Sequence, residues 1–136
     1  MKFKLALFFA VVLFVPILGE MAHAQLDQTV KADVPFDFYA GKQKMPAGSY
    51  TLKFDVGSSN VEIFDADNHG MFLLRNEIQN VNASGASLLF DRLGDRYFLK
   101  TIETSDLDIG FPVNDAERRL ALNTSPTPVV VAANTH

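Results

Sequence analysis

Hydrophobic and polar residues alternate through most of the chain after residue 28, and Gly, Pro, Asn or Asp interrupts the alternation roughly every eight to twelve residues. A period of two predicts strands with one buried face, and the interrupting residues predict turns. The clearest predicted strand covers residues 50–56. Its apolar positions are Tyr50, Leu52, Phe54 and Val56, which alternate with Thr51, Lys53 and Asp55.

The same pattern predicts two hairpins. The strands of the first are residues 61–64 and 71–74, and those of the second are residues 86–90 and 96–102. Asp91 and Arg96 lie on either side of the second turn. We therefore expect an opposite-charge pair between them, worth about 0.2–1 kcal/mol.

A strand is also predicted at residues 29–34, and Phe36 and Phe38 continue its apolar face past Pro35. Because proline has no N–H to donate to a neighbouring strand, Pro35 predicts that this strand is an edge or bulges there. A weaker strand is expected around Ile78 and Val81.

The C-terminal region predicts one helix followed by a tail. Asn114 with Glu117 three residues later is typical of a helix N-terminus, so we expect a short helix through about Leu122. Pro126 and Pro128 follow soon after it. We expect residues 124–136 to be unstructured, or at most a late edge strand.

These elements predict an all-β fold with one short C-terminal helix. About seven short strands in one domain, residues 25–123, are compatible with a single antiparallel β-sandwich or with a partly closed barrel. The pattern alone does not choose between the two.

Residues 1–24 have the layout of a secretory signal peptide. Lys2 and Lys4 precede an apolar run at residues 5–18, and Ala22 and Ala24 are the small residues of a cleavage site. The run is shorter than the roughly 20 residues that a membrane-spanning helix needs. We expect cleavage after Ala24, export to the periplasm or the medium and no stable membrane anchor afterwards. An uncleaved N-terminal anchor is the alternative.

Composition narrows the function classes. The chain has no cysteine, which excludes a lipid-modified cysteine and disulfides. Residues 25–136 keep ten of the twelve basic and fifteen of the sixteen acidic side chains, a net charge of −5. Nucleic acid is therefore not an expected partner, since its phosphates require clustered Lys and Arg.

Candidate chemistry is sparse. His69 and His136 are the histidines of residues 25–136, so we expect no metal or cofactor and assign no catalytic residue. The stretch from Asp65 to Gly70 begins like a calcium loop. The comparison fails at its fifth and twelfth positions, which are His69 and Asn76 instead of an oxygen ligand and a Glu.

Four stretches together resemble a family of short exported bacterial proteins of unassigned function. They are residues 34–38 (VPFDF), 45–52 (MPAGSYTL), 94–99 (GDRYFL) and 116–120 (AERRL). The resemblance implies export and a β fold, and it supplies no activity. The second hairpin of that family more often has His and Tyr where this chain has Asp91 and Leu93, so no role of the hairpin is carried over.

The leading hypothesis is a non-enzymatic exported β-domain that acts by binding to an envelope protein, a surface polymer or itself. A barrel that holds a small apolar ligand and a carboxylate-based hydrolase are the alternatives. If a binding face exists, its candidate residues are the local basic features and the tyrosine beside them: Arg92, Arg96, Tyr97 and Arg118.

Overall fold

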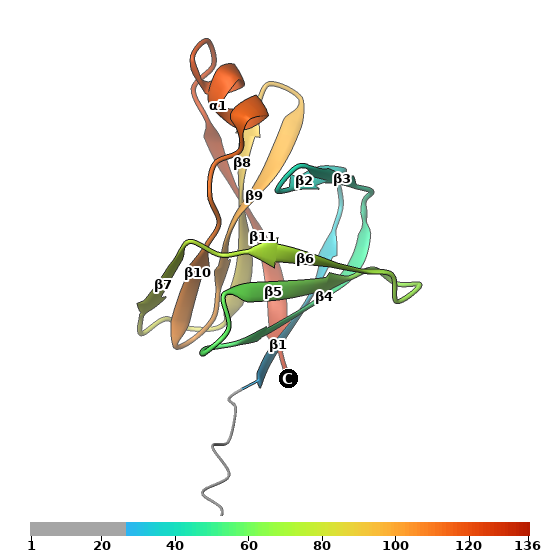
Figure 1. The fold of residues 1–136 in the computed structure, drawn as a ribbon, viewed down its shortest axis with the longest axis vertical. Helices are drawn as coiled ribbons and strands as arrows, with labels where there is room; N and C mark the ends of the chain where they lie inside the picture. The colour runs from blue at the N-terminus through green and yellow to red at the C-terminus, as the bar shows by residue number, and fades with distance from the viewer. Residues whose placement is uncertain (1–26) are drawn as a thin grey trace, which may run out of the picture.

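The computed structural model describes residues 27–136, so the predicted signal peptide lies outside the described residues. One sheet curls into a half-barrel, with one short helix at one end (Figure 1). The strands are β1 (Asp27–Val34), β2 (Phe38–Ala40), β3 (Gln43–Met45), β4 (Gly48–Asp55), β5 (Asn60–Phe64), β6 (Gly70–Leu74), β7 (Glu77–Asn80), β8 (Ala86–Leu93), β9 (Arg96–Glu103), β10 (Leu107–Gly110) and β11 (Thr127–Thr135), and helix α1 is Asp115–Ala121.

The all-β class with one C-terminal helix is confirmed, but the described part of the chain has eleven strands where about seven were expected. Several additional strands are only three or four residues long. An alternation of polar and apolar residues cannot be recognised over so short a segment. Strand β2, for example, joins β9 through a parallel bridge between Tyr39 and Phe98, which no local pattern predicts.

The order across the sheet is β3-β2-β9-β8-β11-β1-β4-β5-β6, while β10 lies beside β9 and β7 beside β10. The two predicted hairpins are confirmed as β5–β6 and β8–β9. The described sheet therefore begins and ends at strands β3 and β6, and β7 ends its side branch.

The predicted pair between Asp91 and Arg96 is wrong. In the β8–β9 register Arg96 lies opposite Leu93, and Asp91 lies opposite Phe98. The Nζ of Lys100 instead donates to Asp91 Oδ2 at 2.7 Å. Lys100 is the diagonal neighbour of Asp91, a position that a long side chain can reach.

The prediction of an edge or bulge at Pro35 is also wrong. Strand β1 ends at Val34, and it lies between β4 and β11 in the interior of the sheet. Pro35 follows the last residue of the strand, where its missing N–H removes no ladder hydrogen bond.

The largest correction concerns residues 124–136. Instead of a tail or an edge strand, β11 lies between β8 and β1 and extends the β-domain beyond residue 123. Pro128 fits because β1 pairs only with the other end of β11, from Ala133 to Thr135. Near Pro128 the strand has one neighbour, so the missing N–H costs no bond to β1.

Aromatic rings fill the interior of the half-barrel. Phe38 and Phe90 are fully buried, with ring centroids 5.3 Å apart in an edge-to-face arrangement. Tyr50 packs in the same way on Phe38 at 5.1 Å. Such pairs contribute about 0.5–1.5 kcal/mol beyond the burial of their area.

Helix α1 begins where the sequence predicts. The N–H of Glu117 donates to Asn114 Oδ1 at 2.7 Å, and the helix ends at Ala121 with Leu122 as its C-cap. Among residues 27–136, no helix has the length and apolar character needed to cross a bilayer.

The position of β11 yields a stability prediction. Val131 packs against the core, whereas its neighbour Val130 is 63 % exposed on the other face of the strand. We expect Val131→Asp to lower the free energy of unfolding by about 2–4 kcal/mol, because it moves a carboxylate toward the apolar interior. Val130→Asp should change it by less than about 0.5 kcal/mol.

Urea unfolding followed by circular dichroism measures both variants, since the chain has no tryptophan for fluorescence. Equal effects of the two substitutions would contradict the placement of β11 inside the sheet.

Candidate functional site

The hairpin that connects β8 and β9 brings three of the four predicted binding residues together. Arg92 lies opposite Tyr97, and its guanidinium lies 5.7 Å from the centre of the Tyr97 ring. The Nε of Arg92 donates to the carbonyl of Gly94 at 2.9 Å. Arg96, the first residue of β9, is exposed.

Tyr97 is partly committed to packing. Its ring stacks on Phe36 with centroids 3.8 Å apart and an interplanar angle of 15°, and Phe36 in turn packs edge-to-face on Phe90. The aromatic surface of Tyr97 is therefore half-buried, and the hairpin tip presents mainly charge.

Arg118 lies on α1, which contacts β8 near this hairpin (Figure 1). Its Nη1 lies 3.6 Å from Asp115 Oδ1, one helical turn away. Both side chains are largely exposed, so this pair contributes less than about 1 kcal/mol. Within residues 27–136, no hydrogen bond or ion pair joins Arg118 to the hairpin arginines.

A cluster of charged side chains, which the sequence did not predict, lies where the helix meets the hairpin. It consists of Asp91, Lys100 and Glu117, and both carboxylates are only 7 % exposed. Lys100 neutralises Asp91 across the strand pair. Burial raises the pKa of Glu117, and the neighbouring charge of Asp91 raises it further. Because these groups lie on three elements, their proximity depends on the tertiary fold.

A second pair of carboxylates lies at the other end of β9. Asp108 is opposite Glu103 in the β9–β10 register, and burial followed by the charge of Glu103 raises the pKa of Asp108. Ser87 Oγ donates to Glu103 Oε2 at 2.6 Å. Paired carboxyl groups can serve as acid and base, so these two are the residues on which a hydrolase would depend.

The Asp65 carboxylate accepts hydrogen bonds from the backbone of its own turn. Its Oδ1 accepts hydrogen bonds from the N–H groups of Asp67 and His69 at 3.0 and 2.8 Å. These hydrogen bonds, that of His69 above all, lower the pKa of Asp65. The side chain thereby stabilises the turn between β5 and β6.

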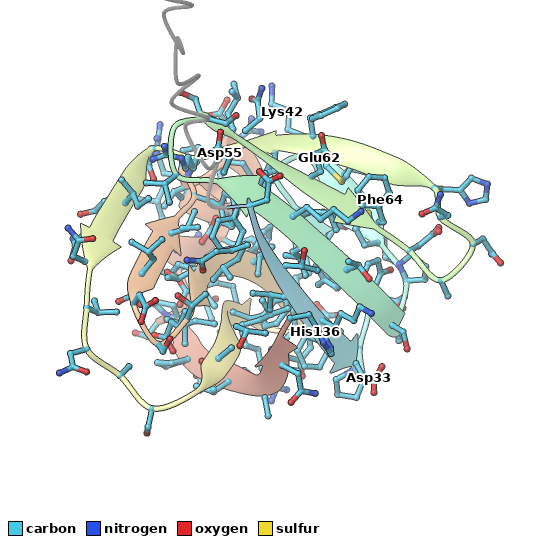
Figure 2. The ribbon with its side chains drawn as sticks, turned by 90° about the horizontal axis from the view of Figure 1, so that it is seen from below. Asp33, Lys42, Asp55, Glu62, Phe64 and His136 are labelled. Atoms are coloured by element: carbon cyan, nitrogen blue, oxygen red, sulfur yellow. The ribbon has the colours of Figure 1, made fainter. Side chains whose placement is uncertain are left out.

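Three open depressions, with volumes of about 550, 360 and 350 Å³, lie along β1 and β4. The first extends to β11, and the second extends across β5 to Phe72 of β6. Polar residues outnumber apolar ones around each depression, although Phe54 and Phe72 contribute much of the wall of the second. Figure 2 labels Asp33, Glu62, Phe64 and His136 among the residues concerned. Lys31 and Lys53 lie on adjacent strands there, and the Nζ of Lys53 lies 5.2 Å from the ring centre of Phe64.

Strand β6 is the most unusual surface element. It is the last strand of the sheet, and residues 27–136 place no strand on its other side (Figure 1). Phe72 is 70 % exposed and Leu74 is 64 % exposed, both on the solvent-facing side. The strand therefore combines unpaired backbone groups with large exposed apolar side chains.

The other two terminal strands of the described sheet are protected against pairing. Strand β3 has three residues and includes Lys44, and β7 has four residues, of which Glu77, Gln79 and Asn80 are polar and exposed. Short length and charged side chains are the usual means by which natural edges avoid association. Strand β6, with the sequence GMFLL, has no charge and no proline.

The one cation next to β6 in sequence is held elsewhere. Arg75 Nε donates to the carbonyl of Ser58 at 2.7 Å, and its Nη2 donates to the carbonyl of Val56 at 2.9 Å. These bonds hold the guanidinium on the turn between β4 and β5. It does not shield the edge of β6.

Comparison of the chain with protein-family models, with curated proteins and with solved structures gives no match. The resemblance to a family of exported proteins thus stays a prediction.

The buried carboxylate of Glu117 predicts a pH dependence of stability. Its ordinary pKa is 4.5, and in the folded state the pKa is higher. Between these two values the folded state keeps a proton that the unfolded state has lost, so the free energy of unfolding falls as the pH rises. Glu117→Gln removes the charge and keeps an oxygen for the N–H of Asn114, and we expect it to remove this decrease.

The measurement is chemical unfolding of both proteins from below pH 4.5 to neutral pH. The variant should gain stability over the wild type as the pH rises. Glu77→Gln, at an exposed position of β7, is the control and should show no such trend. A pH-independent difference between wild type and Glu117→Gln would contradict the assignment.

Proposed function

We propose that this protein is a non-enzymatic exported module that binds an extended protein segment, from an envelope protein or from a second copy of itself, by adding that segment to the free edge of β6. One observation carries the proposal: β6 is a terminal strand with no charge, no proline and two large exposed apolar side chains, Phe72 and Leu74. In natural sheets an edge of this kind is a template for another strand.

The binding mechanism follows from strand chemistry. The unpaired N–H and C=O groups of β6 would form main-chain hydrogen bonds with the incoming segment, which supply affinity without selecting a sequence. Alternate side chains of that segment would pack beside Phe72 and Leu74 on the solvent-facing side. The expected partner therefore has apolar residues at every second position of an extended segment.

The support for a small apolar ligand is weaker. The three depressions on β1, β4 and β5 are open to solvent and lined mainly by polar side chains. Phe38, Phe90 and Phe98 are fully buried and occupy the interior where such a ligand would lie. Apolar ligands are usually enclosed in concave, mainly apolar pockets.

A surface polymer is supported by the polar depressions, and a hydrolase by Glu103 and Asp108. Neither the depressions nor the Glu103–Asp108 pair combines exposed apolar side chains with unpaired backbone groups, as β6 does. The hydroxyl of Ser87 also occupies one oxygen of Glu103, which leaves that carboxylate less free to act as a base. Strand addition at β6 therefore has the most support.

The test uses a synthetic extended peptide, Lys-Val-Thr-Val-Thr-Val-Lys, with a second peptide in which proline replaces the central valine. We expect the first peptide to shift the amide NMR signals of residues 70–74 and to leave those of β3 and β7 unchanged. The proline peptide should have little effect, since it lacks a ladder donor and disfavours an added strand.

Two variants complete the experiment. Phe72→Lys should weaken binding at least about tenfold, because it places a charge at the edge. Val130→Lys is the matched control, since Val130 is 63 % exposed on β11, which β1, β4 and β5 separate from β6 in the sheet. Equal binding by both variants, or signal changes confined to β1 and β4, would overturn the proposal.

A further inference from the structure

We infer that the strand accepted by β6 is β6 of a second copy of this chain, in a two-fold antiparallel pair. This inference rests on the proposed strand addition and names the partner. Two-fold symmetry requires one surface patch to be complementary to itself. The edge of a strand meets this requirement, because antiparallel pairing matches its N–H and C=O groups with those of an identical strand.

The side chains of β6 suit such a pair. The two-fold axis of an antiparallel ladder is perpendicular to the sheet, so the solvent-facing sides of both copies remain on the same side. Phe72 and Leu74 of each copy would then lie beside those of the other. Four apolar side chains that are 64 to 70 % exposed in one copy would cover one another.

The charges at the two ends of β6 are complementary in this arrangement. The turn before β6 contains Asp65 and Asp67, and Arg75 follows the strand. Antiparallel pairing places the start of one β6 beside the end of the other. Each acidic turn would therefore lie near Arg75 of the other copy.

Asp67 is available for such a contact, and Arg75 only in part, because its Nε and Nη2 are held on the turn between β4 and β5. Within residues 27–136, neither Arg75 nor Asp67 has an ion-pair partner, and the Nη1 of Arg75 makes no hydrogen bond. Asp65 is less available, because its carboxylate accepts bonds from its own turn. Asp67 is thus the acidic residue that can form an ion pair with Arg75 of the other copy.

The turn between β2 and β3 adds a further cation. A Cβ on Gly41 would lie 2.8 Å from Leu73 Cδ1, so this turn approaches β6 from the core side. Lys42, the next residue, is exposed (Figure 2). Lys42 therefore places a positive charge near β6, and this charge is already counted in the net charge of −5 over residues 25–136.

The two-fold pairing of β6 explains why association would end at two copies. Among the terminal strands of residues 27–136, a β6–β6 pair uses the one that is unprotected, and the others are the short, polar β3 and β7. The contact is isologous and closed, so it produces a dimer rather than a filament. The patch is small, which is typical of a weak and concentration-dependent dimer.

Sedimentation equilibrium of the signal-free protein tests the inference. We expect a reversible monomer–dimer equilibrium in the wild type and in Val130→Lys, and a dissociation constant at least about tenfold higher in Phe72→Lys. A wild type that stays monomeric at the highest soluble concentration would overturn the inference, as would a Phe72→Lys variant that still dimerises. If the extended peptide nevertheless bound to residues 70–74, strand addition would stand and only the second copy would be rejected.

A charge exchange tests the antiparallel register. Asp67→Lys and Arg75→Glu should each weaken the dimer by about twofold to tenfold, and the double variant should recover most of the loss. Arg75 also holds the turn between β4 and β5, so the urea midpoint of each variant is measured alongside. Asp67→Lys removes no hydrogen bond of the turn, so its dissociation constant alone tests the antiparallel register if Arg75→Glu fails to fold. Unchanged dimerisation in Asp67→Lys, or no recovery in a folded double variant, would overturn the antiparallel pair.

Discussion

The pairing of β11 with both β8 and β1 is the constraint on which the rest of the structure depends. It joins two groups of strands, one formed around β8 and β9 and the other running from β1 through β4 and β5 to β6. Without it, β1 and β8 would both present long unpaired edges. Because β11 is the last strand along the described chain, this joint forms only through contacts between residues far apart in sequence, which is slow compared with local pairing.

A sheet that curls without closing retains terminal strands, and the terminal strands of this sheet differ in length, charge and exposed apolar area. Strands β3 and β7 are short and polar, whereas β6 is uncharged and carries exposed Phe72 and Leu74. Leaving such an edge open favours aggregation unless something covers it. The contrast within one sheet is the reason to assign binding to β6, since neither the hairpin arginines nor the polar depressions combine these properties.

Local features were predictable from the sequence and long-range ones were not. Alternation identified β4 and both hairpins, and the spacing of Asn114 and Glu117 identified α1, because each signal lies within a few neighbouring residues. Strand β11 was missed because two prolines precede a run of three valines that shows no alternation. The cluster of Asp91, Lys100 and Glu117 depends on strand register and helix docking. The apolar sequence of β6 was visible, but its place at the end of the sheet depends on topology.

Hydrogen–deuterium exchange of residues 70–74, measured over a series of protein concentrations, shows whether the free edge of β6 pairs with another strand. Amides that face away from β5 have no partner within the described residues of one copy, so they are expected to exchange fast in dilute protein. Their protection is expected to increase with concentration, while the exchange of the amides of β3 and β7 remains unchanged. Exchange in β6 that is independent of concentration and of added extended peptide would contradict pairing at this edge.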